Sequence, residues 1–389
     1  MTARTRRPLL RALATALLAL MLAWIAGGQY WLGRIDPALA IPLLAPSMLL
    51  LAWWQRREAA RVRRRTILTA LAILFAAQTL LSLSLAGSAG WAQLASVLLA
   101  GVAAAWAADA FAQWRARGRA LRLLAALALM FCWFAAGHAL LSFLYRPFAA
   151  APAAPPATML TGLPLRWTSG GDIAAMIAEG ARDDPALARL EVSGSVKLVD
   201  SLVDDVPPRG STLLVAHPRA LAPQELVAID AFVRGGGRAV VLADALSGWP
   251  MQYPLGDPRN PPVTSLLTPL LDHWGATLGA SPVGETQAVA VDVDGARLRL
   301  FSAGRFDRLP PGCQAYGGRR VALCRIGAGE AWLVGDADLL FAPLWQPLVA
   351  GAPHLRRADT MDWLAARLWD GTAGDGVALR PLWIRSNDD

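Results

Sequence analysis

Four side chains that could do chemistry follow apolar runs in the second half of the chain: His217, Asp244, Asp336 and Asp338. Such runs predict strands buried on both faces, and ligands commonly bind at the carboxyl ends of parallel strands. One interpretation is therefore a metal or acid–base site. The alternative is structural: Asp244 and Asp336 hold turns or cap helices, and His217 only precedes a turn at Pro218.

The spacing of these residues favours the structural interpretation. No two of them stand in a metal-binding pattern such as HxH or HExxH, so we expect no metal and no other cofactor. The second half also contains no GxSxG, GxxxxGK[ST] or GxGxxG motif. Gly235-Gly236-Gly237 follows a predicted helix and precedes a strand, which is typical of a helix C-cap and not of a phosphate-binding loop. We expect no catalytic residue and keep the four side chains as candidate ligand-binding residues.

The three cysteines suggest a structural role. Cys132 lies within a long apolar segment, and Cys313 and Cys324 flank a predicted hairpin turn at Gly317-Gly318. The latter two would form a disulfide if the strand register places them opposite each other, which the sequence leaves open. No histidine neighbours either residue to mark it as a nucleophile.

The element that positions the candidate site is the stretch 211–245. It reads as a strand at Thr212–Ala216, a helix opened by Pro223, a glycine turn and a second strand at Ala239–Ala243. Two buried strands joined by a helix form a right-handed βαβ unit. Further strands, helices and two predicted hairpins follow, so we expect an α/β doubly wound sheet with inserted β-hairpins. The long proline-rich loop after Asp244 is of the kind that often lines sites.

The first half predicts a five-helix membrane domain over residues 1–146. Its five apolar segments each contain about 18 to 25 residues, enough for a hydrocarbon core of roughly 30 Å. An Ala/Pro-rich linker at 147–158 is expected to be extended, and the α/β domain to occupy 159–389. The expected spans are Leu10–Gly28, Pro37–Trp54, Thr66–Gly87, Trp91–Phe111 and Ala120–Tyr145.

The charge distribution predicts the orientation in the membrane. Residues 1–146 hold 16 arginines and three acids, a formal charge of +13, whereas residues 147–389 hold 21 basic and 26 acidic residues, a charge of −5. The mildly acidic second half argues against nucleic-acid binding. Fourteen of the 16 arginines fall on one side of the predicted spans, which the positive-inside rule makes cytoplasmic. We therefore expect a multi-pass protein of a bacterial inner membrane, with a cytoplasmic N-terminus and a periplasmic C-terminal domain.

Two ionisable residues fall within or near the predicted spans. Asp109 is close to the cytoplasmic end of the fourth, and His138 is inside the fifth. Intramembrane ionisable groups suggest a proton relay or transport. The structural interpretation is preferred, because Asp109 can reach the interface and a neutral His138 can bond to a neighbouring helix.

The stretches LVAHPRALAPQELVAIDAFVRGGGRAVVLADA, LLTPLLDHWGATL and AWLVGDADLLF resemble the periplasmic domain of GldG-like proteins, auxiliary components of ABC transport systems. The resemblance covers roughly 160–345. It implies a flavodoxin-like fold similar to class I glutamine amidotransferases, with related modules of the DUF4350 type, and partnership with an ABC permease and ATPase. Amidotransferases carry a cysteine nucleophile at a strand–helix elbow. No cysteine lies at such an elbow here, so that activity is not implied.

These observations lead to a first hypothesis and two alternatives. The first is a non-enzymatic inner-membrane protein, an auxiliary subunit of an ABC-type transport or export system. Its outer domain would bind a partner protein or an envelope glycan. An envelope hydrolase or carbohydrate-binding enzyme that uses His217, Asp244 and Asp336 is the second hypothesis. A transporter that uses Asp109 and His138 is the third.

Overall fold

The chain divides into two compact units in the computed structural model, which describes residues 3–114, 118–166, 183–254, 256–257, 259–283, 285, 287–369 and 379–385. The first unit comprises the residues up to Arg146 together with Pro347–Arg356 and 379–385. The second comprises Pro147–Gln346 and 357–369. The sequence predicts a division at residue 146, but not the return of two later segments to the first unit.

Five helical segments of the described residues are long and apolar enough to cross a membrane. They are Arg7–Ile25, Pro37–Gln55, Ala60–Ala86, Trp91–Gln113 and Arg119–Leu144. The second segment is part 3₁₀ and part α-helix, because Pro42 has no N–H to give to the helical ladder. The elements of the first unit are α1 (Ala3–Ile25), α2 (Gln29–Leu32), η1 (Pro37–Leu43), α3 (Leu44–Gln55), α4 (Ala60–Ala86), α5 (Trp91–Gln113), α6 (Arg119–Leu144) and η3 (Pro353–Leu355).

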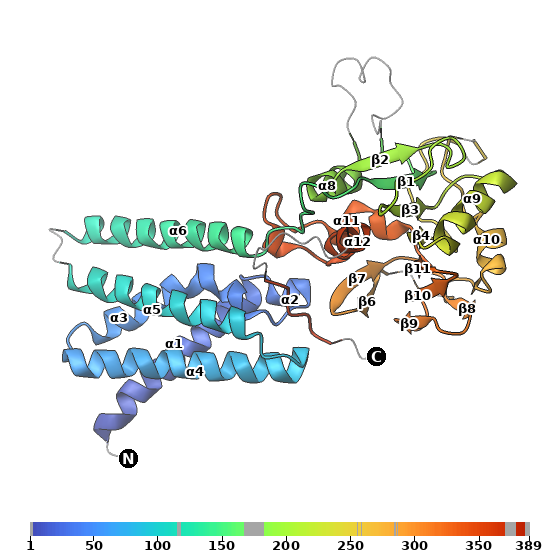
Figure 1. Ribbon diagram of the computed structural model, residues 1–389. Coiled ribbons are helices and arrows are strands. Elements are labelled where there is room, and N and C mark those ends of the chain that lie inside the picture. Colours follow the sequence, from blue (N-terminus) through green and yellow to red (C-terminus); the bar gives the residue numbers. More distant parts are fainter. Residues whose placement is uncertain are drawn as a thin grey trace. The chain divides into compact units, whose positions relative to one another are not determined.

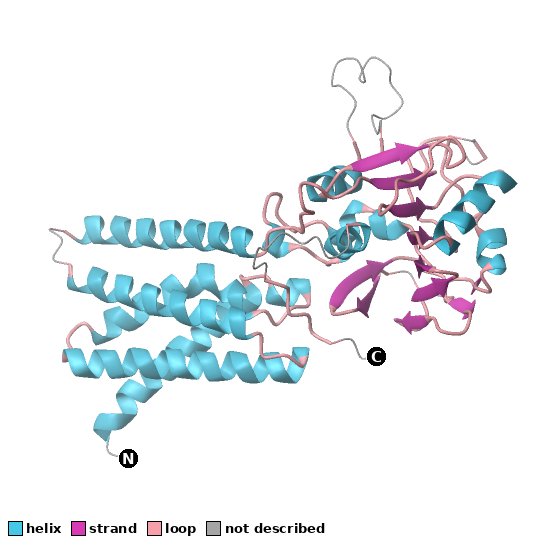
Figure 2. Cartoon of the chain, in the orientation of Figure 1, coloured by secondary structure: helices cyan, strands magenta, loops and turns pink. Residues whose placement is uncertain are grey.

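The first unit is a helical bundle (Figures 1 and 2). α1 packs against α4, α3 against α5, and α6 against η1. Backbone hydrogen bonds hold residues 379–385 to this bundle. Ile35 N donates to Leu382 O at 3.0 Å, and Leu379 N donates to Leu144 O at 2.7 Å.

The second unit is built on a mixed sheet of seven strands among the described residues, in the order β2-β1-β3-β4-β11-β10-β9. The strands from β2 to β11 are parallel to one another, and β10 is antiparallel to both of its neighbours. The strands of the sheet are β1 (Ala157–Thr161), β2 (Val196–Val199), β3 (Thr212–Ala216), β4 (Arg238–Leu242), β9 (Gln314–Tyr316), β10 (Val321–Ile326) and β11 (Gly329–Val334).

Helices cover both faces of this sheet (Figure 1). Alternate residues of each central strand belong to two separate cores, as expected for strands buried on both sides. One core packs the sheet against α8 (Pro185–Ser193), α12 (Thr360–Leu368) and the β6–β7 hairpin (Val289–Val293 and Ala296–Leu300). The other core packs it against α9 (Pro223–Arg234) and α10 (Thr268–His273). The short strand β5 (Thr277–Leu278) pairs with β8 (Phe306–Arg308) in a separate two-stranded sheet. The remaining elements are η2 (Asp338–Leu340) and α11 (Ala342–Trp345).

Several local predictions agree with these elements and others differ. The predicted strand at Thr212–Ala216 and the helix from Pro223 have those limits. The apolar pattern of residues 192–202 predicts a strand, and the strand β2 lies within this stretch but begins only at Val196, because α8 continues to Ser193. The leucine-rich stretch 265–278 predicts a helix, of which α10 is the ordered part, and Gly275 ends it by turning the chain at a φ of 78°. The composition of residues 172–181 predicts a further helix, and this stretch lies outside the described residues.

The linker is also more ordered than its composition suggests. Ala150 N donates to Ser193 O at 2.6 Å, and Phe148 packs against the core beside α12. β1 then begins at Ala157, two residues before the expected start of the domain. Proline content predicts an extended backbone, but it does not show whether that backbone finds partners.

Cys313 and Cys324 form a disulfide, with their Cα atoms 4.2 Å apart. The register of β9 with β10 pairs Gln314 with Leu323, so the two cysteines stand opposite each other at the next position.

We predict that thiol labelling of the denatured protein detects one reactive cysteine, Cys132, before reduction and three afterwards.

Loss of the disulfide in a Cys313→Ala/Cys324→Ala variant should lower the free energy of unfolding by about 2–3 kcal/mol, since the unfolded chain loses a constraint. The labelling experiment checks that the disulfide exists. Three reactive thiols without reductant, in protein prepared under oxidising conditions, would contradict the disulfide.

Candidate functional site

The parallel pairing of β4 with β11 aligns two of the candidate acids. Leu242 is the register partner of Val334, and each is followed two residues later by an aspartate, Asp244 and Asp336. Parallel strands in register end side by side, so the two carboxylates emerge at equivalent positions of the carboxyl edge.

A turn adds the third carboxylate. β11 ends at Val334, and the chain bends so that Asp338 opens the short helix η2. Carboxylate oxygens of Asp244, Asp336 and Asp338 all lie within 4.8 Å of one another. The first two residues are 0% exposed and the third is 2% exposed. We call these three residues the carboxylate cluster.

Backbone amides hold the cluster in place. Asp244 accepts from Leu246 N at 3.0 Å and from Ala337 N at 3.2 Å. Asp336 Oδ2 accepts from Phe301 N at 2.7 Å. Through these bonds Asp244, after β4, is linked to the turn that follows β11, and Asp336, after β11, is linked to the residue that follows β7.

The cluster also holds the proline-rich loop that follows β4. Asp338 Oδ1 accepts from Ser247 Oγ at 3.1 Å, and its Oδ2 accepts from Gly248 N at 2.5 Å. A side chain at Gly248 would meet this carboxylate, because a Cβ there would lie 3.0 Å from Oδ2. A larger residue at this position would force the Asp338 carboxylate or the neighbouring Phe301 ring to shift.

Burial of three like charges shifts their protonation. Burial, and then the neighbouring Asp338 carboxylate, raises the pKa of Asp244 to about 7. Burial raises the pKa of Asp338 to about 6. The pKa of Asp336 is raised well above its usual range by burial and by both neighbouring carboxylates. Without a cation, the cluster therefore retains protons near neutral pH.

His217 does not join the cluster. It follows β3 with a φ of 46°, and its Nε2 donates to Pro262 O at 2.7 Å. Burial lowers the pKa of this histidine, so the ring is neutral at physiological pH. The structure thus brings three of the four candidate residues together and assigns the fourth to holding the far end of the proline-rich loop.

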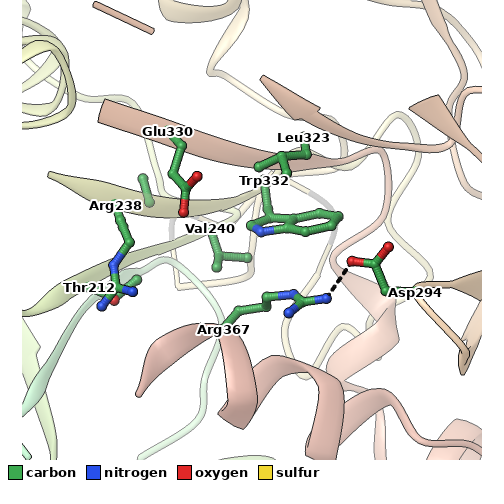
Figure 3. A pocket seen from close by; sticks show the side chains of 9 residues that line it. Thr212, Arg238, Val240, Asp294, Leu323, Glu330, Trp332 and Arg367 are labelled. Atoms are coloured by element: carbon green, nitrogen blue, oxygen red, sulfur yellow. Dashed lines mark hydrogen bonds and ion pairs between the residues drawn. The ribbon is translucent and has the colours of Figure 1, made fainter. Parts of the chain in front are cut away.

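A cavity of about 190 Å³ lies at the opposite, amino end of the same strands (Figure 3). Thr212, Arg238 and Glu330 are register partners on β3, β4 and β11, so their side chains share one face of the sheet. Asp294, Trp332 and Arg367 complete the polar and aromatic part of the lining. The sequence does not reveal this cavity. Its first and last lining residues, Thr212 and Arg367, are 155 positions apart, and the strands are brought side by side only by their pairing in the sheet.

The cavity wall contains an ion pair, and one hydroxyl in it has no partner among the described residues. Arg367 donates to Asp294 at 2.7 Å, and its guanidinium lies 4.6 Å from the centre of the Trp332 ring. Figure 3 shows the arginine beneath the indole, with Glu330 on the other side of Val240. The buried Thr212 Oγ1 has no hydrogen-bond partner among the described residues. The accessible polar groups of the lining are the charged side chains of Arg238, Asp294 and Glu330, which could bind a small polar group.

The two ionisable residues of the predicted spans both have partners within the first unit. Asp109 pairs with Arg63 at 3.0 Å. His138 Nδ1 lies 2.8 Å from His354 Nε2, and Ser142 Oγ lies 3.2 Å from the other ring nitrogen of His354. Burial, followed by the charges of His138 and two arginines, lowers the pKa of His354 to about 3, so this ring is neutral. Because both side chains have partners inside the unit, these contacts support a structural role for Asp109 and His138.

A buried ion pair anchors the same region. Arg34 and Asp36 are both 0% exposed and lie 2.6 Å apart. Tyr145 Oη donates to Asp36 at 2.5 Å, and Arg34 also donates to the carbonyl of His354 at 2.6 Å. Arg34 therefore connects the loop after α2 with the segment Pro347–Arg356.

Comparison with known proteins gives one family match. Residues 183–297 match the family described as "ABC-type uncharacterized transport system". This range runs from the start of α8 into β7 and includes Asp244, but ends before Asp336. None of the curated proteins compared matches the chain.

Solved structures of glycoside-cleaving enzymes show a weak likeness. A β-galactosidase from Rahnella sp. R3 is 17% identical with a TM-score of 0.27, covering 41% of this chain and 25% of the enzyme. The exo-β-1,4-mannosidase Op5Man5 from Opitutaceae bacterium strain TAV5 is 13% identical with a TM-score of 0.32, covering 72% and 49%. A β-galactosidase from Halorubrum lacusprofundi is 17% identical with a TM-score of 0.33, covering 62% and 34%. The chain spans at most about half of each enzyme, and likeness at these scores supports no argument about activity.

We predict that Asp244 makes folding stability depend on pH when divalent cations are removed with EDTA. Its pKa is about 7 in the folded protein and near 3.9 in the unfolded chain, so between these values only the folded state holds the proton. The stability contributed by this group therefore falls as pH rises towards 7. Relative to wild type, Asp244→Asn should become progressively more stable from pH 5 to pH 8.

Chemical unfolding of the detergent-solubilised protein at several pH values measures this difference. Asp272→Asn is the control, because that side chain is 51% exposed on the surface of the same unit. A wild-type-to-variant difference that stays constant from pH 5 to pH 8 would contradict the prediction.

We also predict that Asp36→Ala destabilises the helical unit by about 3–5 kcal/mol, because it leaves the Arg34 guanidinium buried without its counter-ion. The double variant Arg34→Met/Asp36→Ala should recover part of this loss. Denaturant unfolding in a mild detergent measures both. Equal destabilisation by the single and double variants would show that the unpaired charge is not the cause.

Proposed function

We propose that this chain is a non-enzymatic, membrane-anchored auxiliary component of an ABC-type transport or export system. The proposal rests on two features that occur together in this chain. An α/β unit, of which residues 183–297 match a transport-system family, is joined to five helices long and apolar enough to span a membrane.

We infer an inner-membrane location with the α/β unit on the periplasmic side. The arginine-rich connections support this orientation, since the α3–α4 connection and the start of α4 contain Arg56, Arg57 and Arg61, whereas Arg34 is the one arginine between α1 and α3. The disulfide in the α/β unit supports an oxidising compartment.

We further propose that the α/β unit belongs to the flavodoxin-like class, in a form similar to glutamine amidotransferases. Numbered along the chain, its five parallel strands have the spatial order 2-1-3-4-5, which is the order of that class. Both described cysteines of this unit are paired in the disulfide, which supports the absence of a cysteine nucleophile.

The role we propose for the α/β unit is binding a partner protein or an envelope glycan. The cavity lined by Arg238, Glu330 and Trp332 supports this role, because it combines hydrogen-bonding groups of both charges with an aromatic ring. A hydrolase is less well supported. Its acids would have to reach a substrate, and Asp244, Asp336 and Asp338 are at most 2% exposed.

Purification of the tagged full-length protein tests the transport role. After mild cross-linking and solubilisation in a gentle detergent, we expect mass spectrometry to recover an ABC ATPase or permease subunit together with it. The control is a tagged membrane protein with a similar number of spans, expressed at the same level. Recovery of neither subunit above this control would contradict the proposal.

A further inference from the structure

We propose that Asp244, Asp336 and Asp338 together bind one divalent cation of the calcium–magnesium class. Such a site would be formed by residues whose spacing in the sequence matches no known metal-binding motif. It requires no transport partner, so the purified protein alone can test it.

The distances between the carboxylates suit a single ion. Oxygens on opposite sides of a calcium ion are about 4.6–5.2 Å apart, twice the usual metal–oxygen distance. The three residues each offer an oxygen within 4.8 Å of the other two. One ion placed among them could therefore touch all three carboxylates.

A second observation is the missing partner of Asp336. Its side chain is completely buried, and Oδ2 is occupied by the Phe301 amide. Oδ1 is also buried and has no hydrogen-bond partner of normal geometry among the described residues. A buried carboxylate oxygen without a donor is costly, and in this position a cation can satisfy it.

No basic side chain of the described residues neutralises the cluster. Among the described residues, no lysine, arginine or histidine forms an ion pair with any of its three carboxylates. By contrast, Asp36, which is also completely buried, pairs with Arg34 at 2.6 Å.

The donor set selects the class of metal. All three side chains offer hard carboxylate oxygens, with the Ser247 hydroxyl next to Asp338, and neither a thiolate nor an imidazole belongs to the group. Hard oxygen donors suit calcium and magnesium, whereas zinc and copper sites usually contain sulfur or nitrogen ligands.

Equilibrium dialysis of the full-length protein in detergent tests the site. After treatment with EDTA and its removal, we expect about one calcium or magnesium ion per chain at saturation, and a rise in melting temperature when either ion is added. Binding of less than about 0.2 ion per chain at 1 mM of each metal would overturn the proposal.

Two variants assign the binding to these residues. Asp336→Asn keeps an acceptor for the Phe301 amide but removes the charge, and should lower the affinity at least about tenfold. Asp338→Asn should do the same, and serves if the first variant does not fold. The matched control is Asp272→Asn, at an exposed carboxylate of the same unit, which should bind like wild type. Wild-type affinity in a folded Asp336→Asn or Asp338→Asn protein would overturn the assignment.

Discussion

The parallel pairing of β4 with β11 is the constraint on which the α/β unit depends. These strands are separated by 86 residues along the chain, from Leu242 to Gly329, yet every residue of β4 pairs with one of β11. The pairing completes the centre of the sheet and lets alternate residues contribute to the cores on its two faces. It also sets both polar sites: the carboxylate cluster at the carboxyl ends, and the cavity beside Arg238 and Glu330 at the amino ends.

The two ends of the sheet balance charge differently. At the amino ends, cations and anions alternate, and Arg367 is paired with Asp294. At the carboxyl ends, three carboxylates converge in a buried space with no basic side chain paired to them among the described residues. Like charges this close cannot all remain ionised unless a cation is bound. The cluster must therefore hold protons or a metal, and either would stabilise the loop that Ser247 and Gly248 connect to Asp338.

In the helical unit, a buried carboxylate is neutralised by direct pairing with an arginine. Arg34 and Asp36 are buried together, and Tyr145 and the carbonyl of His354 satisfy further hydrogen bonds. His138, which the sequence presents as an isolated polar residue in a span, contacts the ring of His354. A buried ion pair of this kind contributes little net stability, but breaking it by removing one partner costs much more.

The sequence by itself determined the features that depend on local pattern. Runs of apolar residues of sufficient length define the five candidate spans, and the 211–245 stretch defines β3, α9 and β4, because periodicity and turn residues act over a few positions. The strand ends that contribute Asp244 and Asp336 were also recognisable. Only the tertiary structure decided that these acids meet, that Asp338 turns back to join them and that His217 stays apart. The pairing of His138 with His354 was equally hidden. In each case the partners are distant in the chain, and their approach depends on strand register and on a turn, which local residue spacing does not encode.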